Sequence, residues 1–178
     1  MSRTSMPIHA QLLEQAQLLA TLEPRRPVQA SVRRSISASY YAVFHFLVGE
    51  AAGLQAGRGR SNAAHRELLM RCFKHGEMAE VSKAFQRGWS RLPSTVQRLA
   101  PGVVTHPDVL HMADAFLDLQ RQRHIADYDL STRVLRRTAI ACAKQASSAI
   151  ARWPGGLHEP SARAFLACLS CWQRVAAR

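Results

Sequence analysis

The chain has 178 residues, of which 47% are hydrophobic, so it can form one domain with a substantial core and is not disordered throughout. Its longest strongly apolar run, from Tyr40 to Val48, is far shorter than the roughly 20 residues of a membrane helix, and its N-terminus is not typical of a secretory signal. We therefore expect a soluble, cytoplasmic protein of one domain, residues 1–178, with no membrane contact. The net charge of +12 favours a polyanionic or strongly acidic partner. Alternatively, the arginines reflect a GC-rich genome.

Apolar residues recur every three or four positions along most of the chain, which predicts helices throughout. "EPRRP" (23–27), "GLQAGRGR" (53–60) and "PGG" (154–156) interrupt the pattern, and residues 92–107 are expected to be irregular, with one turn at "STVQRLA". In chain order, the predicted helical segments cover approximately residues 12–22, 28–53, 61–73, 81–89, 105–128, 132–153 and 159–175. In no segment do apolar and polar residues alternate convincingly, as they would in a half-buried strand. The sequence thus predicts an all-α protein, a bundle of five or six helices.

Several apolar positions are expected to face the core. The segment 28–53 has a stripe broad enough for a central helix, made of Val32, Ile36, Tyr40, Val43 and Leu47. The segment 132–153, which Ser131 can cap, is expected to face inward with Val134, Ile140, Ala141, Ala143 and Ile150. Cys168 and Cys171 have metal-ligand spacing, but no second pair completes a zinc site. We expect both cysteines to be small buried residues, and we expect no metal.

The segment "RQRHIADYDL" (121–130) concentrates groups with useful chemistry. On a helix, Arg121, His124 and Tyr128 share one face, and Arg123 and Asp127 form an i,i+4 pair on a neighbouring face. A histidine that moves the 2′-hydroxyl proton and a guanidinium that grips the phosphate suit metal-free RNA cleavage. The alternative is an ordinary helix end. Arg123–Asp127 would then be an exposed ion pair contributing a few tenths of a kcal/mol, and Tyr128 a core aromatic.

Two stretches together resemble a known family. "RRSISASYYAVFHFL" (33–47) and, later in the chain, "RHIADYD" (123–129) are similar to the R-x-YYA-x-FH and R-x-x-ADY patterns of the HEPN superfamily (higher eukaryotes and prokaryotes nucleotide-binding), closest to its small bacterial members. "AAHRELLMRCF" (63–73) resembles the family's histidine-bearing third helix. The HEPN-like core covers about residues 18–150, which leaves the first 17 residues and an extra C-terminal helix, about 158–176, outside it.

The resemblance implies an up-and-down helical bundle that forms a homodimer. Many members are ribonucleases of toxin–antitoxin, CRISPR-associated or anti-phage systems, with an arginine followed four to six residues later by a histidine. This chain departs from that pattern, because Ala126 stands five positions after Arg121 and Tyr128 five positions after Arg123. Tyrosine, with a pKa near 10, is a poor base at neutral pH. Either His124 has taken over proton transfer, or the catalytic function is lost.

The resemblance also suggests a protein partner. In some active members, a tyrosine two residues after the motif histidine is modified by a nucleotidyltransferase that serves as the antitoxin. Arg121 and Tyr128 keep that arginine-to-tyrosine spacing, although the histidine between them is missing. We therefore carry a nucleotidyltransferase-type antitoxin, or another protein, as an expected partner beside RNA.

Residues outside this segment complete the expected site. Phosphate contacts need charge but no sequence-specific geometry, so four arginines are predicted to form a phosphate-contacting rim: Arg33, Arg34, Arg58 and Arg60. As separate solvated charges, they would need no such role. His45 and Asp127 are expected to line the cleft, with a hydrogen-bonded interior histidine as the alternative for His45. His65 is expected at the surface or an interface. No cofactor is expected.

Three functions follow from these expectations. The leading hypothesis is a HEPN-type dimer that binds or cleaves RNA in a toxin–antitoxin or defence system, with Arg121 and Arg123 on phosphate and His124 as the proton-transfer group. Because the motif histidine is absent, enzyme activity stays open. The alternative is a catalytically inactive interaction module that binds a protein or a nucleotide. A DNA-binding regulator ranks last, since no helix-turn-helix spacing stands out.

Overall fold

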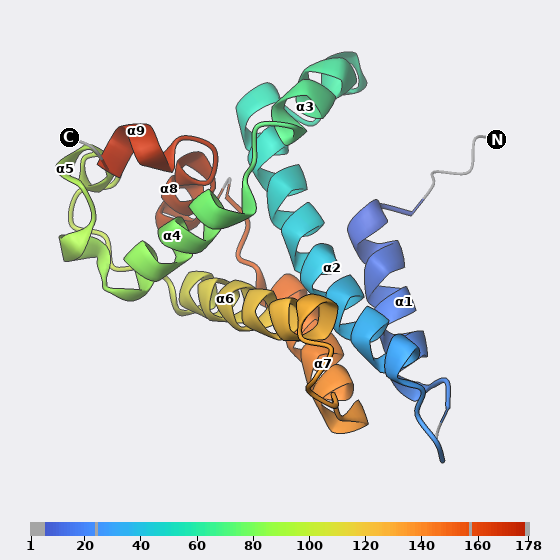
Figure 1. Cartoon of the computed structure of the whole chain (residues 1–178). Coiled ribbons are helices and arrows are strands. Elements are labelled where there is room, and N and C mark those ends of the chain that lie inside the picture. Colours follow the sequence, from blue (N-terminus) through green and yellow to red (C-terminus); the bar gives the residue numbers. More distant parts are fainter. Residues whose placement is uncertain (1–5, 24, 157, 177–178) are drawn as a thin grey trace. The chain divides into compact units, whose positions relative to one another are not determined.

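The computed structural model describes residues 6–23, 25–156 and 158–176, which form helices and connecting loops without a strand (Figure 1). The α-helices are α1 Ile8–Thr21, α2 Gln29–Ala56, α3 Ala63–Met70, α4 His75–Gln86, α5 Ser94–Gln97, α6 Pro107–Tyr128, α7 Arg136–Arg152, α8 Pro160–Cys168 and α9 Trp172–Ala176. Two short 3-10 turns are η1 Arg60–Asn62 and η2 Trp89–Arg91. The all-α prediction is confirmed for the described residues, although they form nine α-helices where five or six were expected. None of these helices has the length and apolarity needed to cross a membrane.

Several helix boundaries differ from the sequence prediction: the segment expected over 81–89 is α4 from His75 to Gln86, and three further differences have a local reason in the hydrogen bonds. Helix α3 ends at Met70, where the sequence pattern continued to Phe73, because the backbone turns through i,i+3 hydrogen bonds after Leu68. The expected final helix over 159–175 divides into α8 and α9, because similar i,i+3 bonds interrupt it between Leu166 and Cys171.

The third difference lies before α7, which begins at Arg136 and not at Thr132. The carboxylate of Asp129 accepts hydrogen bonds from the backbone amides and hydroxyls of Ser131 and Thr132. Ser131 therefore closes a turn with Asp129 and does not cap α7, so that prediction is wrong. The hydroxyl of Ser131, followed by that of Thr132, lowers the pKa of the Asp129 carboxyl to about 2.

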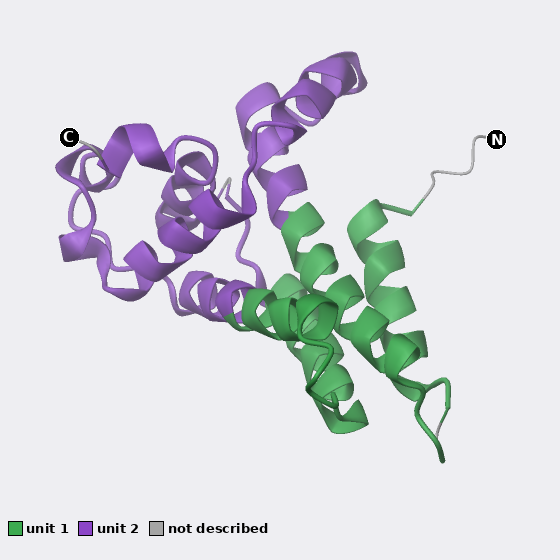
Figure 2. Cartoon of the chain, in the orientation of Figure 1, with its two compact units in different colours: residues 1–46, 118–151 green, residues 47–117, 152–178 purple. Residues whose placement is uncertain are grey.

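The chain contains two compact units, residues 1–46 with 118–151 and residues 47–117 with 152–178, whose boundaries fall at or inside α2, α6 and α7 (Figure 2). Each is described by itself below as unit 1 and unit 2. The expectation of a single domain over the whole chain stays a prediction.

Unit 1 consists of α1, the first part of α2, the last part of α6 and α7 (Figure 2). Its core contains the predicted stripe of α2, since Val32, Ile36, Tyr40 and Val43 are at most 1% exposed. Ala16, Ala38 and Ala143 form a buried cluster with one alanine from each of α1, α2 and α7. Small side chains let these helices approach closely. Of the residues expected to face inward on α7, Ala141 is exposed, and that prediction is wrong.

Hydrogen bonds join the helices of unit 1 across long sequence separations. The buried hydroxyl of Ser35 donates to the carbonyl of Ala16 at 2.7 Å, which ties α2 to α1. Arg136, at the start of α7, donates from Nε to the carbonyl of Ala20 at 3.0 Å. Together these bonds fix α1 against both α2 and α7, and so position the face of α2 that carries the first motif.

Unit 2 packs large aromatic and aliphatic side chains around α4 and α8. The rings of Phe85 and Phe165 meet edge to face with centroids 5.1 Å apart, and both side chains are fully buried. Four apolar residues in and after α8 are buried, namely Phe165, Leu166, Leu169 and Trp172. The core of unit 2 is therefore more aromatic than the alanine-lined contact of unit 1.

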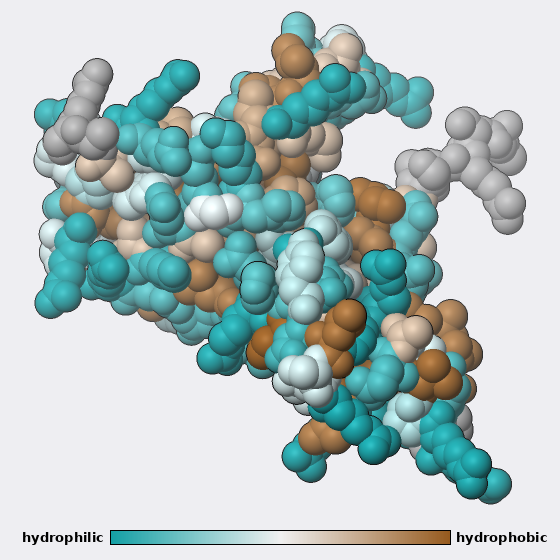
Figure 3. All heavy atoms as spheres, viewed as in Figure 1, coloured by the Kyte–Doolittle hydropathy of each residue, from teal (hydrophilic) through white to brown (hydrophobic). Residues whose placement is uncertain are grey.

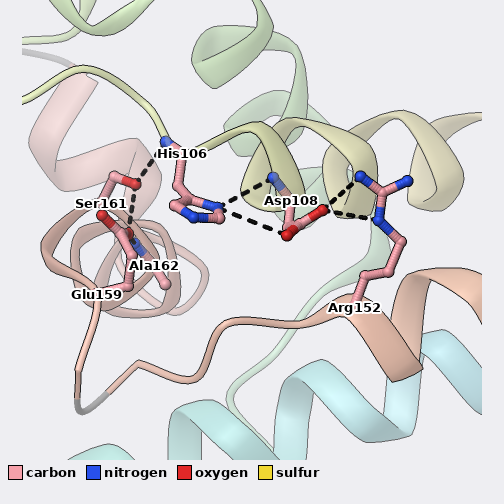
Figure 4. Close-up of polar contacts among 6 residues, drawn as sticks. All are labelled: His106, Asp108, Arg152, Glu159, Ser161 and Ala162. Atoms are coloured by element: carbon pink, nitrogen blue, oxygen red, sulfur yellow. Dashed lines mark hydrogen bonds and ion pairs between the residues drawn. The ribbon is translucent and has the colours of Figure 1, made fainter.

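A polar network in unit 2 satisfies the ends of three helices (Figure 4). At the start of α6, the imidazole Nδ1 of His106 accepts from the amide of Asp108 at 3.1 Å. The guanidinium of Arg152, the last residue of α7, pairs with the Asp108 carboxylate at 2.6 Å. Glu159 caps α8 by accepting from the amide of Ala162, and buried Ser161 accepts from the amide of His106. The network therefore satisfies backbone groups at helix ends.

Candidate functional site

The two motif stretches, residues 33–47 and 123–129, contact each other within unit 1. From α2, Ser37 donates its hydroxyl hydrogen bond to the carboxylate of Asp127 on α6. In the opposite direction, Nη2 of Arg123 donates to the hydroxyl of Tyr41 at 3.1 Å. Side chains far apart in the sequence thus form one polar cluster between α2 and α6. We call Ser37, Tyr41, Arg123, Asp127 and Tyr128 the Arg123 cluster.

Arg123 and Asp127 form the predicted i,i+4 ion pair, with Nε and Oδ2 2.7 Å apart. Their side chains are only 18% and 21% exposed, so the alternative of a fully exposed pair is wrong. Burial alone would lower the pKa of Arg123, but the Tyr41 hydroxyl and the Asp127 carboxylate hold it above its ordinary value. The guanidinium therefore keeps its charge inside a part-buried cluster.

Aromatic rings surround this guanidinium. Its central carbon lies 5.4 Å from the ring centroid of Tyr41, 5.4 Å from that of Tyr128 and 5.7 Å from that of Tyr40. These separations are within the range of cation–π attraction. Tyr40 is fully buried, and that burial raises the pKa of its hydroxyl. The guanidinium of Arg123 is therefore in contact with Tyr40 and Tyr41 of α2 and with Tyr128 of its own helix, α6.

Tyr128 is exposed, which corrects its alternative placement as a core aromatic. Its side chain is 62% exposed, although its hydroxyl accepts from Nη2 of Arg123 at 3.3 Å. The exposed imidazole of His124 lies beside it, with ring centroids 5.1 Å apart. The predicted neighbourhood of His124 and Tyr128 on one helix face is confirmed. The surface end of α6 thus carries two adjacent aromatic rings.

Arg121 belongs to a different set of contacts. It is exposed, and its Nη2 donates to the carboxylate of Asp118, one helical turn earlier. This hydrogen bond and ion pair engage Asp118 and not a member of the Arg123 cluster. Of the two arginines expected to hold phosphate, one is thus exposed in a surface ion pair and the other is held inside the cluster.

The four arginines of the expected rim have different surroundings. Arg34 is exposed on α2, where it forms no ion pair with any described residue. In unit 2, Arg58 pairs with Glu50 at 2.6 Å, and Arg60 is exposed in η1. His65 lies exposed on α3, also in unit 2. The rim therefore has members in both units, and only Arg33 and Arg34 share unit 1 with the Arg123 cluster.

Arg33 has a structural role at the end of α6. Its Nη1 donates to the carbonyls of Ala126 at 2.8 Å and Asp129 at 3.0 Å. Its Nη2 donates to the carbonyl of Thr132 at 2.5 Å. The guanidinium thus satisfies carbonyls that the helix end leaves without an intrahelical donor.

We expect Arg33→Ala to lower the free energy of unfolding by about 1 to 2 kcal/mol, because several part-buried carbonyls lose a charged donor at once. Urea denaturation followed by circular dichroism measures this change. The matched control is Arg34→Ala, which removes the same charge from the next residue and should change the free energy by less than about 0.5 kcal/mol. Equal effects of the two variants would contradict the capping role.

His45 lies half-buried on α2 among aromatic rings. Its ring centroid is 5.3 Å from that of Phe44 and 6.3 Å from that of Tyr41. Burial, and then the nearby charge of His9, lower the pKa of His45 below its ordinary value. His45 contacts Tyr41 but does not line the groove described below, so its expected place in a cleft stays a prediction.

The lowered pKa of His45 makes stability depend on pH. As the pH falls, the unfolded chain binds a proton at His45 before the folded protein does. The stability that comes from keeping His45 neutral is therefore fully present above the unfolded pKa of about 6.5 and is lost as the pH falls through the lower folded pKa. We expect the free energy of unfolding, measured by urea denaturation at several pH values, to fall more steeply below pH 6.5 in the wild type than in His45→Gln. Parallel curves for the two proteins would contradict this.

Sequence reasoning singled out Arg123, His124, Asp127 and Tyr128 but missed two partners from α2. The sequence alone singles out neither Ser37 nor Tyr41 as a site residue. The only sequence signal for Tyr41 was its place in the YYA-x-FH pattern, and Ser37 had none. Their roles depend on the pairing of α2 with α6, which no local pattern encodes.

The described residues present no metal site. No group of three or more histidine, cysteine, aspartate or glutamate side chains is placed to hold a metal ion in those parts of the chain. Cys168 is buried and Cys171 half-buried, both as free thiols, and burial raises the pKa of Cys168 to about 12. A thiol held in its neutral form is a poor metal ligand.

Comparisons with known proteins add no family: no family model matches the chain, and neither a curated protein nor a solved structure matches it. The likeness to HEPN proteins rests on the two motif stretches. What the structure adds is that side chains of these stretches meet in the Arg123 cluster.

Proposed function

We propose that the chain is a HEPN-type module that binds single-stranded RNA through the end of α6, as a homodimer, in a toxin–antitoxin or anti-phage defence system. The observation that carries RNA binding is the exposed ring of Tyr128, which has the guanidinium of Arg123 5.4 Å from its centroid and the ring of His124 beside it. Exposed aromatic rings backed by arginine are the platforms on which unpaired bases stack. The setting and the dimer come from the resemblance.

Charge supports the same proposal. Phosphate binding needs mobile cations near the stacking ring, and the exposed arginines of unit 1 outside the Arg123 cluster include Arg25, Arg26, Arg34, Arg121 and Arg133. The whole chain carries a net charge of +12. Electrostatic attraction of this kind is independent of base sequence and supplies most of the affinity of non-specific binders.

The geometry favours binding over cleavage. A catalytic arginine must grip the phosphate, whereas Arg123 is already engaged by Asp127 and two tyrosine hydroxyls. His124 is the only histidine in the segment 121–130, and its exposed ring contacts Tyr128. Cleavage by His124 would require Arg121 to leave Asp118 and serve as the phosphate ligand. We therefore propose that RNA binding is the retained function.

The test is binding of a fluorescent single-stranded RNA of about ten nucleotides, measured by anisotropy. We expect the affinity to fall about tenfold or more between roughly 50 and 200 mM salt, as for a ligand that contacts two or three phosphates. Absence of binding at the lowest salt would refute the proposal. The same RNA, incubated in EDTA with wild type and His124→Ala, reports cleavage. Cleavage that His124→Ala abolishes would show that the module is a ribonuclease.

A second candidate function, an interaction module for a protein partner, has its own supporting observation. Large apolar residues of unit 1 are exposed near the end of α1, the start of α2 and the end of α6, namely Leu18 at 60%, Leu22 at 51%, Val28 at 52% and Leu130 at 82%. Figure 3 shows brown, hydrophobic surface among the teal side chains of this part of the chain. Both candidate functions assume a homodimer, so sedimentation alone does not separate them, and the RNA-binding assay does. A monomer would contradict the dimer in both.

A further inference from the structure

A groove in unit 1 lies next to the Arg123 cluster. It has a volume of about 530 Å³ and lies between α1 and α2. Its apolar lining includes Leu12 and Leu19 from α1 and Ala38 from α2, while Arg34, Ser37 and Tyr41 contribute polar groups. A volume of several hundred Å³, mostly apolar with a few convergent polar groups, is typical of small-ligand sites.

The groove shares two side chains with the Arg123 cluster. Ser37 lines the groove and donates to Asp127, while Tyr41 lines it and accepts from Arg123 at 3.1 Å. A ligand that contacts these two side chains in the groove therefore lies against the cluster. The ion pair of Arg123 and Asp127 neutralises the charge on that side.

The charges around the groove define the ligand. Arg34 is exposed, lines the groove and has no ion-pair partner in the described parts of the chain, so it can bind an anion. At another part of the lining, the hydroxyl of Ser31 donates to the carboxylate of Glu23 at 2.9 Å, which disfavours an anion there. The site therefore suits a ligand with one anionic end and a flat or apolar body, which the leucines and the Tyr41 ring would contact.

We propose that this groove is a nucleotide subsite in which Arg34 binds the phosphate and the side chains of Leu12, Leu19 and Tyr41 contact the base. The inference rests on the proposed function and deepens it, since the subsite would hold a nucleotide of the same strand that stacks on Tyr128. It predicts that the RNA strand follows α2 from the Arg123 cluster toward α1. No sequence pattern indicated a groove at this position.

The test uses the full-length protein labelled with ¹⁵N and four probes: 5′-AMP, 5′-UMP, adenosine and inorganic phosphate. We expect both mononucleotides to shift backbone amide signals of α1 and of residues 30–41. Arg34→Gln should weaken 5′-AMP binding about tenfold, because it removes a charged hydrogen bond to phosphate, but leave adenosine nearly unaffected. The matched control is Arg137→Gln, which removes an exposed positive charge on α7. It should leave the affinities for 5′-AMP and adenosine unchanged.

A second variant tests the apolar part of the groove. Leu19→Trp places a larger side chain in the groove and should weaken 5′-AMP and adenosine together, with circular dichroism confirming the fold. The proposal is overturned if 5′-AMP shifts no groove amides, or if it binds no better than inorganic phosphate. It is also overturned if Arg34→Gln weakens 5′-AMP no more than Arg137→Gln does.

The outcome for RNA is measured separately. If the RNA of about ten nucleotides binds wild type and Leu19→Trp equally, the groove inference is wrong while the proposed function stands. If that RNA does not bind at all but 5′-AMP still binds in a manner that depends on Arg34, the proposed function is wrong and the nucleotide subsite is supported.

Discussion

Replacing Arg123 with alanine is expected to lower the free energy of unfolding by about 2 to 3 kcal/mol. The substitution removes the Nε contact to Asp127, the donor to the Tyr41 hydroxyl and three guanidinium–ring contacts. It also leaves Asp127 as a part-buried carboxylate whose remaining partner is the hydroxyl of Ser37. Breaking a fully buried pair by removing one partner costs about 3 to 5 kcal/mol, and the partial exposure of this pair reduces that figure.

Urea denaturation with two probes measures this effect. Circular dichroism reports on all helices, whereas tryptophan fluorescence reports on unit 2, because it contains Trp89, Trp153 and Trp172. The matched control is Arg121→Ala, two residues earlier on the same helix, whose side chain is 71% exposed and whose loss should cost less than about 0.5 kcal/mol. If both variants lose the same stability, the Arg123 cluster does not stabilise unit 1.

Tyr128→Ala is expected to weaken RNA binding by about tenfold, since stacking of one base on an aromatic side chain contributes about 1 to 3 kcal/mol. Tyr128 is 62% exposed, so removal of its ring should change stability much less than Arg123→Ala does. Fluorescence anisotropy with the RNA of about ten nucleotides measures the affinity. Tyr128→Phe keeps the ring and should bind within about twofold of wild type. An affinity unchanged in Tyr128→Ala would mean that no base stacks there.

The fold class could be predicted because helix periodicity is a local property. The stripe Val32, Ile36, Tyr40 and Val43 is buried as the three-to-four-residue spacing indicated. Helix ends were harder, because they depend on single hydrogen bonds. The carboxylate of Asp129 accepts from Ser131 and Thr132 and holds them in a turn, where the pattern predicted the start of the helix that begins at Arg136. The inward position predicted for Ala141 was wrong because alanine is only weakly hydrophobic, so it indicates poorly which face of an alanine-rich helix is buried.

The candidate site could be predicted only in part. The i,i+4 pair of Arg123 and Asp127 and the neighbouring rings of His124 and Tyr128 follow from helix geometry alone. The burial of that pair could not be predicted, because it depends on Ser37 and Tyr41 from another helix. The role of Arg33 on the carbonyls of Ala126, Asp129 and Thr132 depends on the same helix pairing and was missed for the same reason.

Photocrosslinking tests the proposed RNA surface most directly. An RNA of about ten nucleotides containing 4-thiouridine would be crosslinked to the wild-type protein at low salt, and the modified peptides identified by mass spectrometry. We predict crosslinks in the tryptic peptide from His124 to Arg133, which contains both exposed rings at the end of α6. If the RNA binds but its crosslinks are confined to other peptides, the assignment of RNA binding to the end of α6 is contradicted.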